Sequence, residues 1–247
     1  MTQERVVLVT GGSKGLGRGL VEAFTASGDT VVSCGRHQPE QSTPGTFFQC
    51  DVRDPDQVAR LVDSIVADHG RLDIVVNNAG GTPYAPADSM SPRLFEKVVA
   101  LNLLAPFYVA QRANRVMQSQ EHGGVIINIG STVAIRPSVD VSAYVASKAG
   151  LVGLTRSLAI EWAPKVRVNL VSPGLLQTEL LEEYCGDDVP AVEATIPAGR
   201  FATPADVASV CLMLAGSEAA YVTGAEVVVD GGGEIPAWVN AVVRENR

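Results

Sequence analysis

Long apolar runs are missing from this chain. No stretch reaches the roughly 18 consecutive apolar residues that a membrane-spanning helix needs. The first residues, Met1 to Arg5, are polar and lead directly into a predicted strand, whereas a secretion signal needs an apolar stretch close to the N-terminus. We therefore expect a soluble, cytoplasmic protein that has no membrane as a partner.

Basic residues and clustered cysteines are also scarce. The 247 residues include 19 Lys and Arg against 27 Asp and Glu, a formal net charge of −8. Because a nucleic-acid surface needs a basic stripe for the phosphates, this balance argues against nucleic acid as a partner, although a local basic pocket for an anionic ligand stays compatible with it. The cysteines, Cys34, Cys50, Cys185 and Cys211, are too scattered for a disulfide framework or a metal site.

What the chain does contain is a regular alternation of apolar β-branched runs and helical patterns, with 46% hydrophobic residues. Strands are predicted at 6–9, 31–34, 47–50, 74–76, 125–129, 166–171 and 226–229. Helices are predicted after the first strand, at 55–69, from 91, from Tyr144 to about 162, and after Pro204. Continuous apolar strands separated by helices are typical of a parallel sheet covered on both faces, so we expect one α/β domain over residues 1–247.

A glycine-rich turn between the first predicted strand and the first predicted helix, Thr10 to Gly17, is the first candidate binding site. Backbone N–H groups and the helix dipole at such a position favour a pyrophosphate, and glycine lets the ligand approach the backbone. The turn therefore predicts a dinucleotide site. Its candidate contact residues are Gly11, Ser13, Lys14, Gly15, Leu16 and Gly17.

The end of the second predicted strand bears on the choice of dinucleotide. It reads Cys34, Gly35, Arg36, about 20 residues past the glycine turn, where NAD-selecting proteins place an acid for the ribose hydroxyls. No acid stands there. Arg36 and Lys14 can instead neutralise a 2′-phosphate, so NADP(H) is the expected cofactor and NAD(H) the alternative. A solvated surface arginine is the other interpretation of Arg36.

Tyr144 and Lys148 are four residues apart in a predicted helix. Positions i and i+4 share one helix face at about 5–6 Å, so the ammonium can lie beside the phenol. A neighbouring cation favours the phenolate and would lower the tyrosine pKa from its usual value near about 10. Tyr144 is therefore a candidate proton donor, although such a pair also arises by chance on surface helices.

Asn102 is an unexpected polar residue in the helix that Ser91 and Pro92 begin. It continues an apolar stripe, where an amide normally costs stability. Because Pro106 has no N–H, it cannot donate to the Asn102 carbonyl four residues earlier, which leaves that carbonyl open to another partner. A core asparagine beside a proline kink is the alternative.

Together these residues resemble the short-chain dehydrogenase/reductase family, and in particular its NADP-type, 3-oxoacyl-[acyl-carrier-protein] reductase-like members. The similarity runs from Val6 to about Gly232. Besides the glycine turn, it is carried by Asp51-Val52, Asn77-Asn78-Ala79-Gly80, Asn102, Ser131, Tyr144 with Lys148, Pro173-Gly174 leading to Thr178, Val222-Thr223-Gly224, and Asp230-Gly231-Gly232. The resemblance implies a Rossmann-type doubly wound parallel sheet of about seven strands with helices on both faces.

The resemblance also implies how the cofactor is held. Asp51 and Val52 are expected to contact the adenine. Residues 78–80 are expected to line the cofactor ribose, and the 173–178 segment to hold the carboxamide. The residues concerned are Asn78, Ala79, Gly80, Pro173, Gly174, Leu176 and Thr178.

For catalysis, the resemblance implies four residues. Tyr144 is expected to be the acid/base, and Ser131 to donate a hydrogen bond to the substrate oxygen. Lys148 is expected to hold the nicotinamide ribose and lower the pKa of Tyr144. The main chain at Asn102, in a kinked helix, would bind a water that links Lys148 to solvent.

The expected reaction is hydride transfer between NADPH and a carbonyl carbon, or its reverse. A dinucleotide-binding sensor or scaffold without chemistry would show a broken tetrad, and all four residues are present. Enoyl reduction or dehydration would usually change the Tyr-to-Lys spacing. The commonest implied substrate is a 3-oxoacyl thioester, and an apolar cyclic or steroid-derived ketone is the main competitor.

The substrate pocket is expected to form from loops 81–86 and 133–141 and from a mobile acidic lid at 175–200; a solvated acidic loop is the alternative for the lid. Arg136 can reach an anionic group or face water. The acidic lid disfavours a polyanionic carrier unless Arg136, Arg93 or Arg200 form a basic patch. The apolar tail, 233–247, is expected to pack Trp238 on a neighbouring subunit, in a homotetramer or homodimer.

Overall fold

Parallel strands form a single seven-stranded sheet in the computed structural model, which describes residues 4–179, 181 and 186–235. From edge to edge the strands run β3, β2, β1, β4, β5, β6, β7. Their bounds are β1 (Val6–Thr10), β2 (Thr30–Gly35), β3 (Thr46–Gln49), β4 (Ile74–Asn77), β5 (Gly124–Ile129), β6 (Val166–Pro173) and β7 (Glu226–Val229). The predicted doubly wound α/β fold is confirmed.

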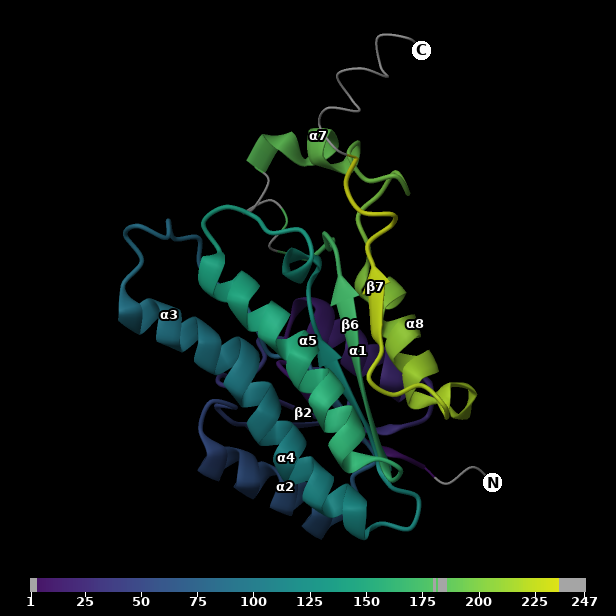
Figure 1. The fold of residues 1–247 in the computed structure, drawn as a ribbon. Helices are drawn as coiled ribbons and strands as arrows, with labels where there is room; N and C mark the ends of the chain where they lie inside the picture. The colour runs from purple at the N-terminus through teal and green to yellow at the C-terminus, as the bar shows by residue number, and fades with distance from the viewer. Residues whose placement is uncertain (1–3, 180, 182–185, 236–247) are drawn as a thin grey trace.

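Helices cover both faces of the sheet. On one face, α1 (Gly15–Ala26) packs against α8 (Pro204–Ala215); on the other lie α2 (Pro55–His69), α4 (Ala105–Ser119) and α5 (Ser142–Trp162). α3 (Pro92–Val99) packs beside α5 (Figure 1). Neighbouring strand residues such as Leu8 and Val9 belong to different cores, one on each face. Burial on both faces is why the strands read as continuous apolar runs.

The predicted element boundaries lie close to the observed ones, and those of α2 and β7 coincide with them. The reason is visible at α2. The Asp54 side chain accepts hydrogen bonds from the backbone N–H groups of Asp56 and Gln57, Pro55 occupies the first turn, and Gly70 ends the helix in the left-handed conformation with φ 74°. These local signals mark both ends of the helix within the sequence of the helix itself.

A π-helical turn, η1 (Ala100–Leu104), joins α3 to α4. At its end, the N–H of Ala105 donates to the carbonyl of Ala100, a spacing of five residues. Pro106 follows at once and has no N–H to offer the Asn102 carbonyl. The interruption of the helix expected near Asn102 thus takes the form of a wider turn, and it places Asn102 in the interior, with none of its surface exposed.

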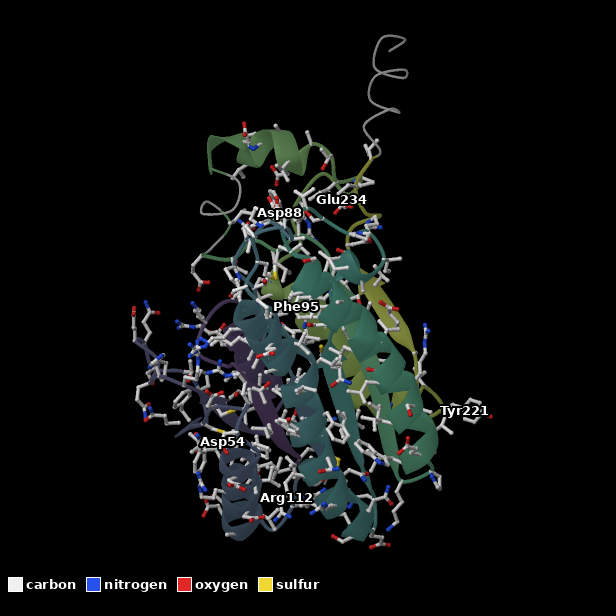
Figure 2. The ribbon with its side chains drawn as sticks, turned by 60° about the vertical axis from the view of Figure 1, so that its left-hand side comes forward. Asp54, Asp88, Phe95, Arg112, Tyr221 and Glu234 are labelled. Atoms are coloured by element: carbon white, nitrogen blue, oxygen red, sulfur yellow. The ribbon has the colours of Figure 1, made fainter. Side chains whose placement is uncertain are left out.

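The predicted lid and tail are only partly described. After β6 the chain forms a short turn, η3 (Gly186–Asp188), and α7 (Val189–Glu193), and the N–H of Ile235 donates to the Thr195 carbonyl at 2.8 Å. Glu234 lies at the same end of the molecule as Asp88 (Figure 2). Residues 180 and 182–185 of the lid and 236–247 of the tail, including Trp238, lie outside the described residues. No helix in the described part of the chain is long and apolar enough to cross a membrane.

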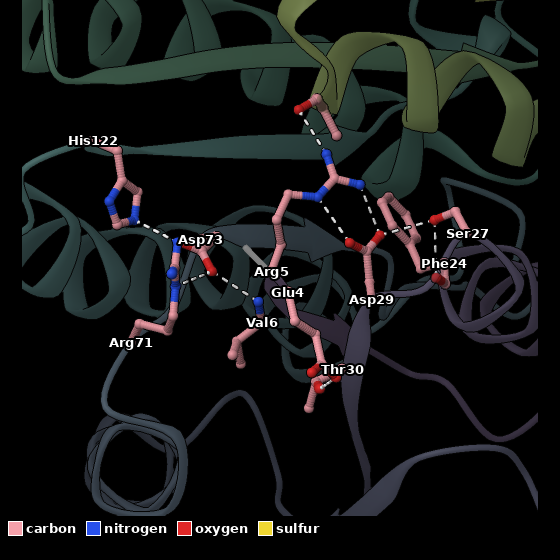
Figure 3. Close-up of polar contacts among 11 residues, drawn as sticks. Glu4, Arg5, Val6, Phe24, Ser27, Asp29, Thr30, Arg71, Asp73 and His122 are labelled. Carbon is pink, nitrogen blue, oxygen red and sulfur yellow. Dashed lines mark hydrogen bonds and ion pairs between the residues drawn. The ribbon is translucent and has the colours of Figure 1, made fainter. Parts of the chain in front are cut away.

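Two carboxylates tie together the amino ends of the strands (Figure 3). Asp73 accepts hydrogen bonds at 2.7 Å from the Val6 N–H, Arg71 Nε and His122 Nε2. Asp29 accepts two more from Arg5, at 2.8 Å each. These contacts hold together the amino ends of the strands, which lie opposite the predicted site, and we call this end of the sheet the braced edge. The loops that are expected to bind ligands follow the carboxyl ends of the strands.

Candidate active site

The glycine turn is shaped by contacts that only glycine permits. A Cβ at Gly17 would lie 2.0 Å from the Gly11 carbonyl oxygen, and one at Gly12 would lie 2.6 Å from the Ser33 Cβ. Gly11 and Gly15 have positive φ, 69° and 52°. No side chain caps α1, whose N-cap residue is Lys14. The first N–H groups of this 12-residue helix therefore face the turn, as a pyrophosphate site requires.

Asn78 fastens the glycine turn to the end of β4. Its Nδ2 donates to the carbonyls of Thr10 at 2.9 Å and Gly11 at 3.2 Å. In return, the Thr10 hydroxyl accepts from the N–H groups of Asn78 and Ala79, at 3.0 Å each. The predictions named Asn78 and Ala79 but not the Thr10 hydroxyl. A threonine at the end of the first strand was the available signal for it.

Asp51 lies after β3, on the expected adenine side. Its carboxylate accepts from Arg53 Nε at 2.9 Å and from the Arg53 N–H at 3.0 Å. These bonds, with the charges of Arg53 and Arg36, hold the pKa of Asp51 below its usual range despite partial burial. Val52 beside it is buried. Arg53 was not among the predicted site residues, because an arginine two residues past an aspartate carries no distinctive signal.

Both cations predicted to select the cofactor are exposed. Lys14 is at the start of α1, and Arg36 directly follows β2, where its carbonyl accepts from Gln49 Nε2 at 2.9 Å. Arg36 is close enough to Asp51 for its charge to lower the pKa of that carboxyl. The structure thus leaves both positive side chains exposed, Arg36 near the expected adenine contact and Lys14 at the glycine turn.

Asn102 joins η1 to the loop after β4. Its Nδ2 donates to the carbonyls of Gly81 at 2.8 Å and Val98 at 2.9 Å, while its Oδ1 accepts from the Gly81 N–H at 3.0 Å. A Cβ at Gly80 would lie 2.8 Å from Asn102 Oδ1 and 3.5 Å from Lys148 Nζ. Gly80, Asn102 and Lys148 therefore meet at one point, and the Asn102 side chain itself holds Gly81, the residue that follows the segment predicted to line the ribose.

Lys148 is buried, with 3% of its surface exposed. Its Nζ donates to the Ile129 carbonyl at 2.7 Å and lies 5.4 Å from the centre of the Tyr144 ring. Burial disfavours the charged form and lowers the pKa of Lys148 to about 8. A second buried contact, Asn128 Nδ2 to Thr155 Oγ1 at 2.9 Å, joins β5 to α5 and sets the spacing of these two elements.

Ser131 and Tyr144 stand at the two ends of the β5–α5 loop. Ser131 is half-buried, and its hydroxyl accepts from the Val133 N–H at 3.3 Å at the start of η2 (Thr132–Ala134). Tyr144, also half-buried, is in the first turn of α5, one turn before Lys148. The loop between them is the one expected to line the substrate pocket.

The segment after β6 approaches the glycine turn. A Cβ at Gly15 would lie 3.7 Å from the Thr178 methyl group and 3.6 Å from Glu179 Oε2. Leu176 bridges to Ala202, and Gly174 packs against Asp230. Pro173, Gly174, Leu176 and Thr178 thus lie at the carboxyl edge of the sheet with the other predicted residues. No group of three or more metal-ligating side chains occurs among the described residues.

Comparison with known proteins agrees with this fold. A family model described as enoyl-(acyl carrier protein) reductase matches residues 11–234. D-threitol dehydrogenase of Mycolicibacterium smegmatis is 35% identical, with 92% of both chains covered. 3-Oxoacyl-[acyl-carrier-protein] reductase MabA of Mycobacterium tuberculosis is 37% identical, again with 92% of both chains covered.

A solved structure, the ligand-free aldohexose dehydrogenase of Thermoplasma acidophilum, superimposes with a TM-score of 0.88 at 33% identity and covers 93% of this chain and 94% of that one. The chain belongs to the short-chain dehydrogenase/reductase family. It is an oxidoreductase that acts on alcohol or ketone groups and binds a nicotinamide dinucleotide.

Proposed function

We propose that this protein interconverts a ketone and a secondary alcohol with NADP(H), using Tyr144 as the acid/base. The observation that carries the proposal is the buried Lys148 ammonium, fixed at 2.7 Å from the Ile129 carbonyl and 5.4 Å from the Tyr144 ring centre. A buried cation costs free energy, so a structure that keeps one beside a phenol supports a functional role for the pair.

The nicotinamide supplies or accepts the hydride when the cofactor is bound. The protein's own residues then manage the proton and the oxygen. In reduction, Tyr144 gives its proton to the carbonyl oxygen while the Ser131 hydroxyl donates a hydrogen bond to that oxygen. Oxyanion donors of this kind contribute about 3–4 kcal/mol, and a positioned acid about 10²–10⁴-fold in rate.

Lys148 and Asn102 support this proton transfer indirectly. The Lys148 ammonium favours the phenolate that Tyr144 becomes and would bind the ribose of the cofactor. The Asn102 side chain holds the Gly81 backbone through two hydrogen bonds, which keeps the loop at Gly80 next to Lys148. Regeneration of the Tyr144 proton through a water at the Asn102 main chain belongs to the same proposal.

The cofactor assignment rests on charge. Arg36 and Lys14 are exposed cations at the end of β2 and the start of α1, and residues Gly35 and Arg36 offer no carboxylate at the position where a ribose 2′-hydroxyl would be bound. A 2′-phosphate matches these two positive charges better than a hydroxyl does, so NADP(H) is preferred over NAD(H).

The substrate classes follow from the relatives and the loops. Relatives are named for a sugar alcohol, for an aldohexose and for a 3-oxoacyl carrier thioester. Ile135, Val139 and Leu175 are exposed apolar residues on the loops expected to line the pocket. They support an apolar substrate surface, compatible with a 3-oxoacyl thioester or an apolar cyclic ketone. A homotetramer or homodimer in the cytoplasm also belongs to the proposal.

A panel of substrates with NADPH and with NADH tests this function. It contains 3-oxoacyl thioesters, diketones, quinones, cyclic ketones, steroid ketones and secondary alcohols, and nicotinamide absorbance reports turnover. We expect turnover of at least one carbonyl or alcohol, with NADPH or NADP⁺ preferred. Absence of turnover throughout the panel, by a protein that still binds NADPH, would favour a sensor without chemistry.

A further inference from the structure

Arg136, in the loop between Ser131 and Tyr144, does not point freely into water. Its guanidinium pairs with Asp230, just after β7, and its Nε lies 2.9 Å from Glu234 Oε2. A Cβ at Gly233 would lie 2.6 Å from Arg136 Nη1, so the guanidinium is packed against the backbone there. The side chain of Asp230 is only 12% exposed, and the pKa of Arg136 is raised by this partner. We call Arg136, Asp230 and Glu234 the clasp.

The clasp joins three segments around the substrate loop. The Ala198 N–H donates to the Gly231 carbonyl at 3.0 Å, and the Ile235 N–H donates to Thr195. Residues 194–199 of the lid region are thus bound to residues 230–235, and Arg136 binds the latter to the β5–α5 loop. A movement that frees Arg136 must therefore break two ion pairs at the point where the three segments meet.

The charge around this rim is negative. The clasp has two carboxylates for one guanidinium. Asp88 and Asp140 are exposed on the neighbouring loops, and Asp88 lies at the same end of the molecule as Glu234 (Figure 2). Arg200 is bound to Asp206 by bonds of 2.7 and 2.9 Å. Of the three arginines that could form a basic patch for a carrier, Arg136 and Arg200 are therefore already paired with carboxylates, and Arg93 is exposed.

We propose that Arg136 is a positioning residue which, by being neutralised in the clasp, makes the site select an uncharged substrate and disfavour one attached to a polyanionic carrier. This inference rests on the proposed function and narrows its substrate class. Like charges brought together cost free energy, whereas a neutral alcohol or ketone meets no such barrier at the rim.

The test compares one acyl group on two carriers. Acetoacetyl-coenzyme A carries several phosphate charges, and acetoacetyl-N-acetylcysteamine carries none. With saturating NADPH, we expect kcat/KM to be at least about 10-fold higher for the neutral thioester, mainly through KM. The difference should shrink as salt is raised from 0.01 to about 1 M, because the screening length falls from about 30 to 3 Å.

Two variants of equal charge separate the clasp from net charge. Glu234→Gln removes one carboxylate from Arg136. Glu218→Gln removes one carboxylate from the turn that follows α8. This turn lies at the braced edge, because Arg5 donates to the carbonyl of Ala215, the last residue of α8. We expect Glu234→Gln to lower KM for the coenzyme A thioester by about 3-fold or more, with kcat and the neutral thioester changed less than about 2-fold. Glu218→Gln should move neither KM.

Each result decides between the possibilities. A wild-type protein that prefers the coenzyme A thioester, or a KM that Glu234→Gln does not shift, overturns the role of the clasp while the proposed function stands. Turnover of a neutral alcohol or ketone with neither thioester accepted supports an uncharged substrate. No turnover of any panel compound indicates that the proposed function itself has failed.

Discussion

The Nζ atom of Lys148 lies 5.4 Å from the centre of the Tyr144 ring and is held there by a 2.7 Å hydrogen bond to the Ile129 carbonyl. The two side chains come from successive turns of α5, and the carbonyl comes from the last residue of β5. The packing of α5 on β5 therefore sets the electrostatic environment of the phenol. Neither residue alone would define a reaction.

Tyr144→Phe should keep NADPH binding and lose turnover. The ring still packs, but no proton can reach the carbonyl oxygen, so we expect kcat to fall by about 10²–10⁴-fold. NADPH fluorescence titration should give a Kd within about 2-fold of wild type. Tyr221→Phe, at a fully exposed tyrosine, is the matched control. Wild-type-like rates in Tyr144→Phe would refute the assignment of Tyr144.

Lys148→Met should separate stability from activity. A pKa lowered to about 8 means that burial costs the charged form roughly 3 kcal/mol. Methionine removes that cost but leaves the Ile129 carbonyl without its donor, at about 1–2 kcal/mol. We expect an unchanged or higher Tm together with loss of turnover. Lys97→Met, at an exposed lysine on α3, should change neither. A large fall in Tm would show that the ammonium is chiefly structural.

The same residue predicts a pH dependence of stability. The pKa of Lys148 is lower in the folded protein, about 8, than its model-peptide value of 10.5. Between these pH values the unfolded chain binds more protons, so the Lys148 contribution to the free energy of unfolding rises with pH. Urea titrations at pH 7.5 and 9.5 should show a larger gain for wild type than for Lys148→Met. Equal gains would contradict the lowered pKa.

The fold could be predicted because its signals are local. Asp54, Pro55 and Gly70 mark the ends of α2, and buried parallel strands leave continuous apolar runs. The glycine turn was also local, since strand, turn and helix are adjacent in the sequence. What could not be predicted was the partner of each polar group. Arg136 finds Asp230 94 residues away, and no pattern within either segment encodes that pairing.

The same distinction holds for the candidate site, where some features could be predicted from the sequence and others could not. Its residues could be named from motifs, but the Asn102 side chain proved to hold Gly81 rather than to be a passive core amide. Pro106 predicted a free carbonyl; it could not predict a π-helical turn, because α3 and η1 lie against α5 and such long-range packing leaves no pattern near Pro106. Thr10 and Arg53 were missed because isolated polar residues after strands are common.

Asn102→Ala should destabilise the protein and disturb the site together. It removes the two hydrogen bonds that Asn102 donates to the carbonyls of Gly81 and Val98 and the one that it accepts from the Gly81 N–H, each loss costing about 1–3 kcal/mol if water cannot replace it. We expect a fall of several °C in Tm and a lower kcat. Asn114→Ala, on α4 beside Gln118, is the control. A kcat change without loss of stability would instead indicate a direct catalytic role.

Arg36→Ala should discriminate between the two dinucleotides. If Arg36 binds the 2′-phosphate, its removal should raise KM for NADPH by about 10-fold, the equivalent of about 1.4 kcal/mol. NADH has no such phosphate and serves as the internal control, with a KM expected to stay within about 2-fold. Equal effects on both cofactors would show that Arg36 acts through Asp51 or the loop after β2, and an absent effect would support a solvated surface arginine.

Asp73→Asn should weaken the braced edge and flatten its response to acid. Burial by itself would raise the pKa of Asp73, but hydrogen bonds from Arg71, Val6 and His122 outweigh it and leave the pKa below the usual value. A carboxyl with a lowered folded pKa stabilises the protein above its unfolded pKa of about 3.9, and that stability is lost as the pH falls through the folded pKa. We therefore expect the Tm of the wild type to fall more steeply between pH 5 and 3 than the Tm of Asp73→Asn. The variant should already be less stable at pH 7 by about 1–3 kcal/mol, because one amide cannot accept all of these bonds.

Asp68→Asn, at an exposed position on α2, should leave both the Tm at pH 7 and the acid slope unchanged. If Asp73→Asn kept the wild-type slope, the acid sensitivity would have to come from other carboxylates, with Asp29 beside Arg5 the first to examine.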